Sequence, residues 1–312
     1  MPLYCGVNGV RREIRELYTG VGGVRKQLSE MWASEGGVKK LLYRAVKGTP
    51  IRDLPVGSIV KMGRYYDSDI SWIVAEHNHA GYPSNSVTLV SEKIIKLCCM
   101  DAMESGGTSD RELYGNNVYS LSNIRQWLNK KGLLWYQSQH TFDREPSNNY
   151  VWENYNEYSD EQGFLTGFSD DLRSIILPTD IVVAKPNYDG AGSEIITDSI
   201  FLLSSSEVGL GSENGISEGS RLELFSDNSS RKAFPTDLAV LNSEYKDSGL
   251  SSSVSWHYGL RSPNASFQYY FRFVNSSGLL RYDDAYKGDM GIRPAMNVTD
   301  SALVDDSGFI VV

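Results

Sequence analysis

The sequence predicts an α+β protein with a mixed or antiparallel sheet and few helices, preceded by a short segment of β-hairpin repeats. Three observations predict this class: a glycine-valine repeat at the start, short apolar runs separated by turn residues, and one clear helical pattern. A chain of 312 residues can bury a substantial core. We expect residues 1–47 to form the repeat segment and residues 48–312 to form one large domain, with the proline-bounded stretch 49–55 at their junction.

The repeat segment has a period of fourteen residues and reads YCGVNGVRREIREL, YTGVGGVRKQLSEM and WASEGGVKKLLYRA. Asn8-Gly9 and Gly22-Gly23 favour two-residue hairpin turns, because both turn residues need positive φ. We therefore predict short β-hairpins with Val10, Ile14 and Leu17 on the buried side. The same spacing also fits a helical face, so short helices broken at glycine pairs remain the alternative. Units this small need one another, another chain or a particle to bury an apolar face.

The large domain contains several apolar runs that predict strands. A turn at residues 67–69 separates the runs at 59–62 and 70–75, and residues 200–203 form a continuous apolar run typical of a buried strand. The last is expected to close a sheet beside the N-terminal end of the domain. The predicted strands are residues 59–62, 70–75, 87–90, 200–203 and 303–312.

Residues 121–128 show the clearest helical pattern. The apolar face consists of Leu121, Ile124 and Leu128. Trp127 is expected at the edge of that face, and Ser120 or Ser122 can cap the start of the helix.

Two polar stretches predict loops. Residues 137–160 are rich in Asn, Tyr, Glu and Ser and show no periodicity, and residues 209–219 are rich in Gly, Ser and Glu. Because long ordered loops are often functional, we expect residues 137–160 to form a long loop on the surface.

Residues 255–298 carry the strongest functional signal. Trp256-x-x-Gly259-Leu260-Arg261-Ser262-Pro263 and Gly291-Ile292-Arg293-Pro294-Ala295 are expected to form core and turns, with both arginines bonded to backbone carbonyls. Between these motifs, Tyr, Phe, Asn, Ser and Asp are concentrated, a composition typical of binding surfaces. The candidate ligand-binding residues are Tyr258, Asn264, Phe267, Tyr269, Tyr270, Arg272, Asn275, Tyr282, Asp283 and Tyr286.

Charge and composition exclude several classes of protein. The net charge of -9 argues against a nucleic-acid binder that relies on neutralising phosphates. No apolar run approaches the length of a membrane span and no secretory signal precedes the repeats, so we expect cytoplasmic synthesis without membrane insertion. The sequence contains three cysteines, Cys5, Cys98 and Cys99, and an odd number of neighbouring and distant cysteines gives no disulfide framework, so we expect free thiols. We expect Cys98 and Cys99 to pack as small hydrophobic residues.

Signatures of catalysis are weak. His77 and His79 are the only close pair of histidines, and the sequence identifies no third metal ligand beside them. Acidic pairs such as Asp170-Asp171 and Asp283-Asp284 would serve a glycosidase or a calcium site only with a geometry that the sequence does not give. We therefore expect no enzyme activity, no catalytic residue, no metal and no cofactor.

The two motifs that flank the aromatic stretch resemble the C-terminal signature of an uncharacterised domain family. That family is widespread in Gram-positive bacteria, their phages and prophages, and its fold is related to C-type lectins and formylglycine-generating enzymes. The resemblance covers the chain from about Leu54 to its end. Upstream motifs follow in the order of the family: GSIV at 57–60, GRY at 63–65, ISWIV at 70–74, LVSE at 89–92, SNIRQWLN at 122–129 and TDSIFLLS at 197–204.

The resemblance implies a C-type-lectin-like domain in a phage or prophage tail protein that binds a host cell-surface protein or glycan. Glycine-valine repeats are similar to those at the N-termini of phage tail proteins, where they attach the protein to other tail or baseplate proteins. We therefore expect a virion component that forms a homo-oligomer, with a trimer favoured. Formylglycine-generating enzymes depend on cysteines in their cleft, which the C-terminal half of this sequence lacks, so their activity is not expected.

Some relatives with this fold are variable proteins of diversity-generating retroelements, whose surface positions are rewritten. Adenine-directed mutagenesis of asparagine codons gives Asn, Tyr, Ser, Asp and Phe, the residues that crowd this stretch, although aromatic strands and Asn-Ser turns give the same composition unaided. The alternatives from other classes are a particle-borne glycan or cell-wall hydrolase and a purely structural tail component. For the repeats, the alternative is a flexible appendage or a platform packed on the large domain.

Overall fold

The computed structural model describes residues 3–7, 10–14, 18–21, 24–27, 30–35, 38–44 and 47–312. The chain forms two compact units, Met1–Gly48 and Thr49–Ile310. In the described residues strands are frequent and helices are few and short, so the molecule is sheet-rich and of the predicted α+β class. No helix among the described residues is long and apolar enough to cross a membrane.

The first unit contains antiparallel strand pairs. They are β1 (Leu3–Val7) with β2 (Val10–Ile14), β3 (Tyr18–Val21) with β4 (Val24–Gln27), and β5 (Glu30–Glu35) with β6 (Val38–Arg44). Val7 lies opposite Val10, the register that a two-residue hairpin turn gives. The predicted hairpin strands are confirmed, and the alternative of short helices is wrong. Asn8-Gly9, Gly22-Gly23 and Leu17 lie outside the described residues, and the burial of Val10 and Ile14 stays a prediction.

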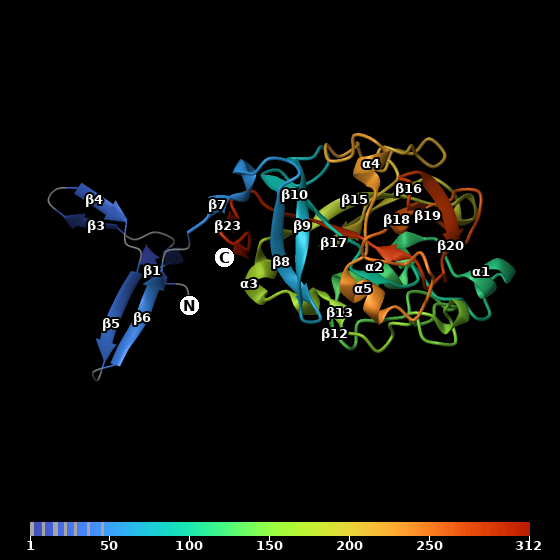
Figure 1. The fold of residues 1–312 in the computed structure, drawn as a ribbon, viewed down its shortest axis with the longest axis horizontal. Coiled ribbons are helices and arrows are strands. Elements are labelled where there is room, and N and C mark those ends of the chain that lie inside the picture. Colours follow the sequence, from blue (N-terminus) through green and yellow to red (C-terminus); the bar gives the residue numbers. More distant parts are fainter. Residues whose placement is uncertain are drawn as a thin grey trace. The chain divides into compact units, whose positions relative to one another are not determined.

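The larger of the two main sheets in the second unit is antiparallel, and Figure 1 shows three of its strands, β8, β9 and β10, side by side. Its strand order is β14 (Ile176–Leu177), β22 (Pro294–Thr299), β10 (Ser86–Ser91), β9 (Ser68–His77) and β8 (Ile59–Tyr65), and β17 (Ile200–Leu202) also pairs with β22. The strands predicted at 59–62, 70–75, 87–90 and 200–203 are confirmed. The turn between β8 and β9 lies at Tyr66-Asp67 instead of 67–69, because Ser68 already pairs with Tyr65.

The second main sheet is mixed. Its order is β11 (Lys96–Leu97), β21 (Gly291–Ile292), β18 (Tyr258–Pro263), β19 (Tyr270–Val274) and β20 (Leu280–Asp284). β18 and β21 run parallel, whereas β18, β19 and β20 follow one another in antiparallel order. These three strands, orange to red in Figure 1, come from the stretch that the sequence marks as functional.

Short strand pairs and a three-stranded sheet complete the second unit. They are β12 (Lys131–Gly132) with β13 (Gly163–Phe164), β15 (Thr179–Ala184) with β16 (Ser193–Asp198), and β24 (Ile310–Val311) beside β23 (Leu303–Val304) and β7 (Thr49–Pro50). The strand predicted at 303–312 is therefore two short strands, because a turn capped by the Asp305 carboxylate separates them. As expected, β23 pairs beside the N-terminal end of this unit.

The α-helices are α1 (Ser109–Tyr114), α2 (Asn123–Asn129), α3 (Asp170–Ser174), α4 (Asn228–Arg231) and α5 (Asp237–Asn242). The 3-10 helices are η1 (Ile51–Asp53), η2 (Tyr119–Leu121), η3 (Trp152–Asn154), η4 (Leu165–Gly167) and η5 (Asn187–Asp189). α2 is the helix predicted at 121–128, but it begins later and Leu121 belongs to η2, because Ser122 caps α2 by accepting a hydrogen bond from the backbone N–H of Arg125. Trp127 was expected at the edge of the apolar face but is fully buried, because its ring packs against Tyr158 and Phe164 while its indole N–H donates to the carbonyl of Gln162.

Residues 137–160 correct another expectation. They are largely without regular structure, but Val151 and Tyr158 belong to the core, and the Tyr158 ring stacks on Trp135 with 5.4 Å between ring centroids. The stretch is thus only partly a surface loop, because these side chains anchor it to the core. Cys98 and Cys99 are free and fully buried, as expected for small hydrophobic residues, and burial raises the pKa of Cys98 to about 12.

Candidate functional site

The β19–β20 hairpin builds one exposed surface of the second unit. Because side chains alternate across a strand, Tyr270 and Arg272 lie on the same side of β19, and Tyr282 of β20 lies directly opposite Arg272. The Tyr270 and Tyr282 ring centroids are 4.8 Å apart, and the Arg272 guanidinium lies 5.6 Å from the Tyr282 ring. The register of one hairpin thus places two rings and a cation together.

Residues preceding β19 add two more rings. Phe267 lies 5.0 Å from Tyr270 and stacks on Tyr282 at 6.4 Å with an interplanar angle of 20°. Tyr269 lies 4.2 Å from Tyr270. Phe267 is 42% exposed and Tyr282 is 48% exposed, so apolar ring area faces solvent here.

Tyr114, at the end of α1, extends the row of rings. Its ring lies 5.0 Å from Tyr269 and 5.9 Å from Tyr286. Tyr114 was missed by the sequence analysis, because nothing local distinguishes it from any other tyrosine at the end of a helix. We define the aromatic face as Tyr114, Phe267, Tyr269, Tyr270, Arg272, Tyr282 and Tyr286.

Buried polar groups hold the loop that presents the aromatic face. The Asn117 side-chain amide donates to the carbonyl oxygens of Phe267 at 2.8 Å and Tyr270 at 2.9 Å. Arg111 donates from Nε to the carbonyl of Gln268 at 3.0 Å, and Thr108 bonds the Gln268 side chain. Because Asn117 is fully buried, the loop is fixed to the core and not free to rearrange.

Charge on the aromatic face is balanced. Arg272 Nε donates to Glu213 Oε1 at 2.6 Å, which neutralises the guanidinium while its plane stays beside the Tyr282 ring. The hydrogen bond with Tyr270, followed by burial, raises the pKa of Tyr269, so its phenol is neutral at physiological pH. The surface therefore offers neutral rings and hydroxyls with one paired cation.

Two predicted residues lie inside the protein. Tyr258 is 1% exposed and donates its hydroxyl to the carbonyl of Arg231, and Asn264 is buried beside Asn117. Their expected exposure is wrong, because β18 and the residue after it are covered on both sides. A tyrosine in an aromatic stretch looks the same in sequence whether its strand is covered or not.

Two others are placed away from the aromatic face. Asn275 closes the β19–β20 turn, where its Oδ1 accepts from the backbone N–H groups of Ser277 and Leu279. Asp283 lies opposite Phe271 and therefore projects from the side of the sheet that Tyr282 does not use. The structure thus brings together Phe267, Tyr269, Tyr270, Arg272, Tyr282 and Tyr286, but not Tyr258, Asn264, Asn275 or Asp283.

The framework arginines bond backbone carbonyls, as predicted. Arg261 is fully buried, donates to the carbonyls of Val182 and Leu202, and forms a bidentate ion pair with Glu207 at 2.7 Å. Arg293 is also buried and donates to the carbonyl of Ser91. Neither is available to a ligand.

The histidine pair does not form a recognisable metal site. His77 Nε2 lies 2.9 Å from the carbonyl oxygen of Leu54, and His79 Nδ1 lies 2.7 Å from Glu76 Oε2. Within the part of the chain that the structure describes, no group of three or more His, Cys, Asp or Glu side chains could hold a metal ion.

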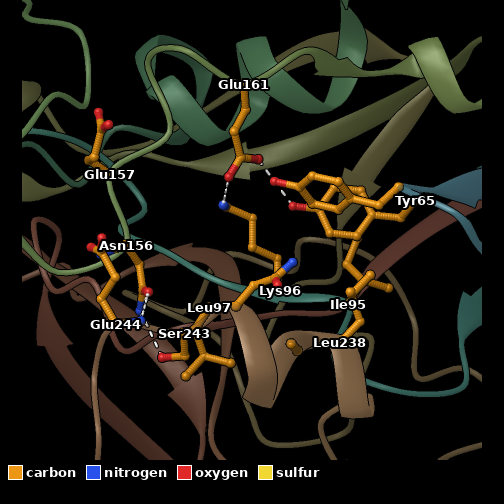
Figure 2. Close-up of a pocket in the computed structure, with 13 residues that line it drawn as sticks. Tyr65, Ile95, Lys96, Leu97, Asn156, Glu157, Glu161, Leu238, Ser243 and Glu244 are labelled. Atoms are coloured by element: carbon orange, nitrogen blue, oxygen red, sulfur yellow. Dashed lines mark hydrogen bonds and ion pairs between the residues drawn. The ribbon is translucent and has the colours of Figure 1, made fainter.

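A cavity forms a separate candidate site. It measures about 150 Å³ and is lined by Tyr65, Tyr66, Ile95, Lys96, Leu97, Asn156, Glu157, Glu161, Leu238, Ala239, Asn242, Ser243 and Glu244. Figure 2 shows the Lys96 ammonium pointing to the Glu161 carboxylate, which also accepts the Tyr65 hydroxyl at 3.1 Å. Sequence reasoning missed this site, because its residues come from four segments that are distant along the chain.

Electrostatics fixes the protonation of the cavity. Burial alone would lower the pKa of Lys96, but the adjacent Glu161 carboxylate outweighs burial and the pKa is raised, so the amine stays an ammonium. Burial, and then Glu161, raises the pKa of Tyr65 well above its usual value, so its phenol stays a donor. Lys96 is therefore suited to holding a ligand and not to acting as a nucleophile or base.

A family model described as a domain of unknown function (DUF6273) matches residues 85–300, more than half of the chain. That range contains every residue of the aromatic face. No curated protein and no solved structure matches the chain.

Proposed function

The chain belongs to the DUF6273 family, whose function is unknown, and we propose that it is a recognition protein that binds a cell-surface ligand through the aromatic face. The observation that carries the proposal is the row of contacting rings around Tyr270, in which Phe267 and Tyr282, at 5.0 and 4.8 Å, are exposed and the others are half-buried. Clustered aromatic side chains with a paired arginine are the residues that dominate binding energy in interfaces. Binding, and not catalysis, is the chemistry that such a surface supports.

Rigidity supports the same proposal. Tyrosine and phenylalanine present large contact areas at low cost in conformational entropy. Asn117 and Arg111 fix the backbone that carries these rings before any ligand arrives. A preorganised face loses little entropy on binding, so more of its contact energy appears as affinity.

We further propose that the second unit has a C-type-lectin-like fold and that the protein is a component of a phage or prophage tail. In this proposal residues 1–47 attach the protein to other tail or baseplate proteins as a homo-oligomer, with a trimer favoured. Several copies on one particle would raise the apparent affinity for a cell surface through effective concentration. Retroelement-driven diversification of the Tyr-, Asn- and Ser-rich face belongs to the same proposal.

The test is binding of the full-length protein to intact Gram-positive cells, measured by flow cytometry. Phe267→Ser and Phe142→Ser are matched variants, because the two rings are 42% and 41% exposed but only Phe267 lies on the aromatic face. We expect Phe267→Ser to lose roughly thirtyfold in affinity, the size of a binding hot spot, and Phe142→Ser to bind like the wild type.

Other outcomes favour the alternatives. Equal binding by both variants would mean that the aromatic face is not the receptor site. Release of soluble sugar fragments from isolated cell walls would favour the hydrolase. If the wild type binds no cells and releases nothing, the structural tail component is favoured.

A further inference from the structure

We propose that the cavity around Lys96 and Glu161 is a second binding site, which takes a hydroxyl-rich saccharide unit that carries no acidic group. This site shares no residue with the aromatic face, so the inference does not depend on the proposed function. It rests on the size of the cavity, on the hydrogen-bonding capacity left inside it, on its charge and on the tyrosine at its edge.

The cavity is large enough for a small ligand once its neighbour is included. A second hollow of about 410 Å³ adjoins it and shares the lining residues Tyr65, Ile95 and Leu238. Small-molecule sites typically measure about 300–1,000 Å³. The smaller cavity can thus hold one polar ring or part of it, while the larger hollow leaves room for a linked unit.

Lys96 has donors to spare. Its side chain is 9% exposed, and an ammonium carries three N–H donors. Among the described residues its recorded hydrogen bond goes to Glu161, and the Tyr158 ring lies 5.6 Å from Nζ as a cation–π contact. Buried donors without acceptors are unfavourable, so a ligand that brings oxygen acceptors into the cavity is stabilised.

The charge of the lining excludes acidic ligands. Three carboxylates, those of Glu157, Glu161 and Glu244, stand against the one ammonium of Lys96, so the lining is net negative. Carboxylates are also strong acceptors for hydroxyl donors. An alcohol both accepts from Lys96 and donates to carboxylates without adding negative charge, and a sugar brings several alcohols into a small volume.

Tyr66 occupies an unusual position at this cavity. It lies in the β8–β9 turn with φ of 48°, and its ring is 56% exposed. Asparagine dominates the other non-glycine residues with positive φ in the described chain, and Tyr66 is the one aromatic residue among them. A bulky residue in this conformation is strained, which favours a role for the ring itself. An exposed ring beside a polar cavity provides the apolar surface against which the C–H face of a sugar packs.

The wall formed by Asn156, Ser243 and Glu244 is preorganised. Asn156 donates from its amide to Ser243 Oγ at 3.2 Å and to the carbonyl of Gly288 at 2.7 Å, and its backbone N–H bonds Glu244 at 2.9 Å. These bonds hold Glu244 and Ser243 at the cavity without a ligand, as Figure 2 shows. Little reorganisation is then required on binding.

The test uses the full-length protein and the methyl glycosides of glucose, galactose and N-acetylglucosamine, followed by saturation-transfer NMR and titration. Tyr66→Gly removes the ring and relieves the strain, so this variant should melt at the wild-type temperature or higher. Asn85→Gly is its matched control, because Asn85 also has positive φ and is exposed but does not line the cavity. Leu238→Trp fills the boundary between the two hollows and provides a second, independent block.

We expect at least one neutral glycoside to bind saturably, with roughly tenfold weaker binding to Tyr66→Gly and Leu238→Trp and unchanged binding to Asn85→Gly and to Phe267→Ser. The result for Phe267→Ser separates this site from the aromatic face. Absence of saturable binding, or equal binding by both cavity variants and the wild type, overturns the proposal. Glucuronate binding more tightly than methyl glucoside overturns the exclusion of acidic sugars.

Discussion

β18 and β20 belong to one sheet, with only β19 between them, but the polar side chains of β18 are buried and those of β20 are exposed or half-buried. Every residue of β18 is buried, and its arginine is fully paired inside the protein. β20 is largely exposed or half-buried, and Tyr282 turns its ring to solvent. The difference separates two functions of polar residues: in β18 they specify the fold, and in β20 they are free for recognition.

Substitutions in the two strands should therefore differ in what they change. Changes in β18 should appear as lost stability, whereas changes in β20 and the adjoining rings should appear as lost binding with the fold intact. The variants below test that division in order of decreasing effect on stability.

Arg261→Met is expected to have the largest effect. Arg261 and Glu207 are both fully buried, and the Tyr82 hydroxyl also donates to Glu207 at 2.5 Å. Removing one partner of a buried ion pair leaves an uncompensated charge and costs about 3–5 kcal/mol in the free energy of unfolding. Urea unfolding followed by circular dichroism measures this loss.

The control is Arg272→Met, in the neighbouring strand β19. Arg272 also pairs with a glutamate, but its side chain is 20% exposed, and Glu213 keeps a hydrogen bond from the backbone N–H of Ala265. We expect a loss of about 1 kcal/mol. Similar losses from the two variants would contradict the division between buried framework and surface.

His257 gives the next effect, and it depends on pH. Its ring packs on Phe273 of β19 at 5.4 Å, near Asp283, Lys287 and Asp289. Although Asp289 Oδ2 lies 3.8 Å from Nε2, burial dominates and lowers the pKa of His257 to about 4. In the unfolded chain the pKa of a histidine is about 6.5. Between about pH 6.5 and about pH 4 the unfolded state therefore binds a proton at His257 that the folded state does not bind, so stability falls as the pH falls. His257→Gln should remove up to about 3 kcal/mol of this loss at pH 4, measured as urea midpoints from pH 7 to 4.

His140 is the control with the opposite sign. A hydrogen bond to Glu104 outweighs burial and raises the pKa of His140, so its contribution to stability is present below about pH 6.5 and is lost as pH rises through the raised value. Relative to wild type, His140→Gln should therefore lose stability at low pH and approach wild-type stability above the raised pKa. If both variants shift the pH profile in the same direction, the assignment of His257 as a buried neutral imidazole is wrong.

Asn117→Ala should have an intermediate effect on stability, because Asn117 connects the buried core to the loop that carries the aromatic face. The substitution leaves the carbonyl oxygen of Phe267 without its side-chain donor, and it removes one of the two donors to the carbonyl oxygen of Tyr270, which keeps the Asn264 N–H. We expect a loss of about 1–3 kcal/mol, together with faster hydrogen exchange in residues 264–270. Asn214→Gly, which removes an exposed hydrogen bond to Asn187 at a positive-φ position that glycine tolerates, should leave both measurements near wild type. Unchanged exchange in Asn117→Ala would mean that the loop is held by other contacts.

The sequence could predict the regions that one continuous segment builds. Strand periodicity and turn residues gave β8, β9, β10 and β17, and the aromatic composition of residues 255–298 pointed to the rings of the β19–β20 hairpin. The backbone-bonding roles of Arg261 and Arg293 also followed from their motifs. In each case the information lies within a few residues of the side chain that uses it.

Long-range packing set the limits of prediction. Asn117 supports Phe267 across 150 residues, and Lys96 meets Glu161 across 65, so no local pattern joins either pair. The sequence could not predict which tyrosines are buried for the same reason. Tyr258 and Tyr282 stand in similar aromatic surroundings, but only the tertiary structure covers the strand that carries Tyr258.

The smallest expected effect on stability comes from Tyr282→Ser. Its ring is 48% exposed, and its contacts with Phe267 and Tyr270 are worth about 0.5–1.5 kcal/mol as aromatic pairs. The same substitution at buried Tyr258 removes a ring from the core and should cost about 3–5 kcal/mol. Thermal melts and cell binding measured on both variants make the sharpest comparison of the two strands. Tyr282→Ser should melt near wild type and bind cells poorly, because the ring that it lacks belongs to the surface and not to the core.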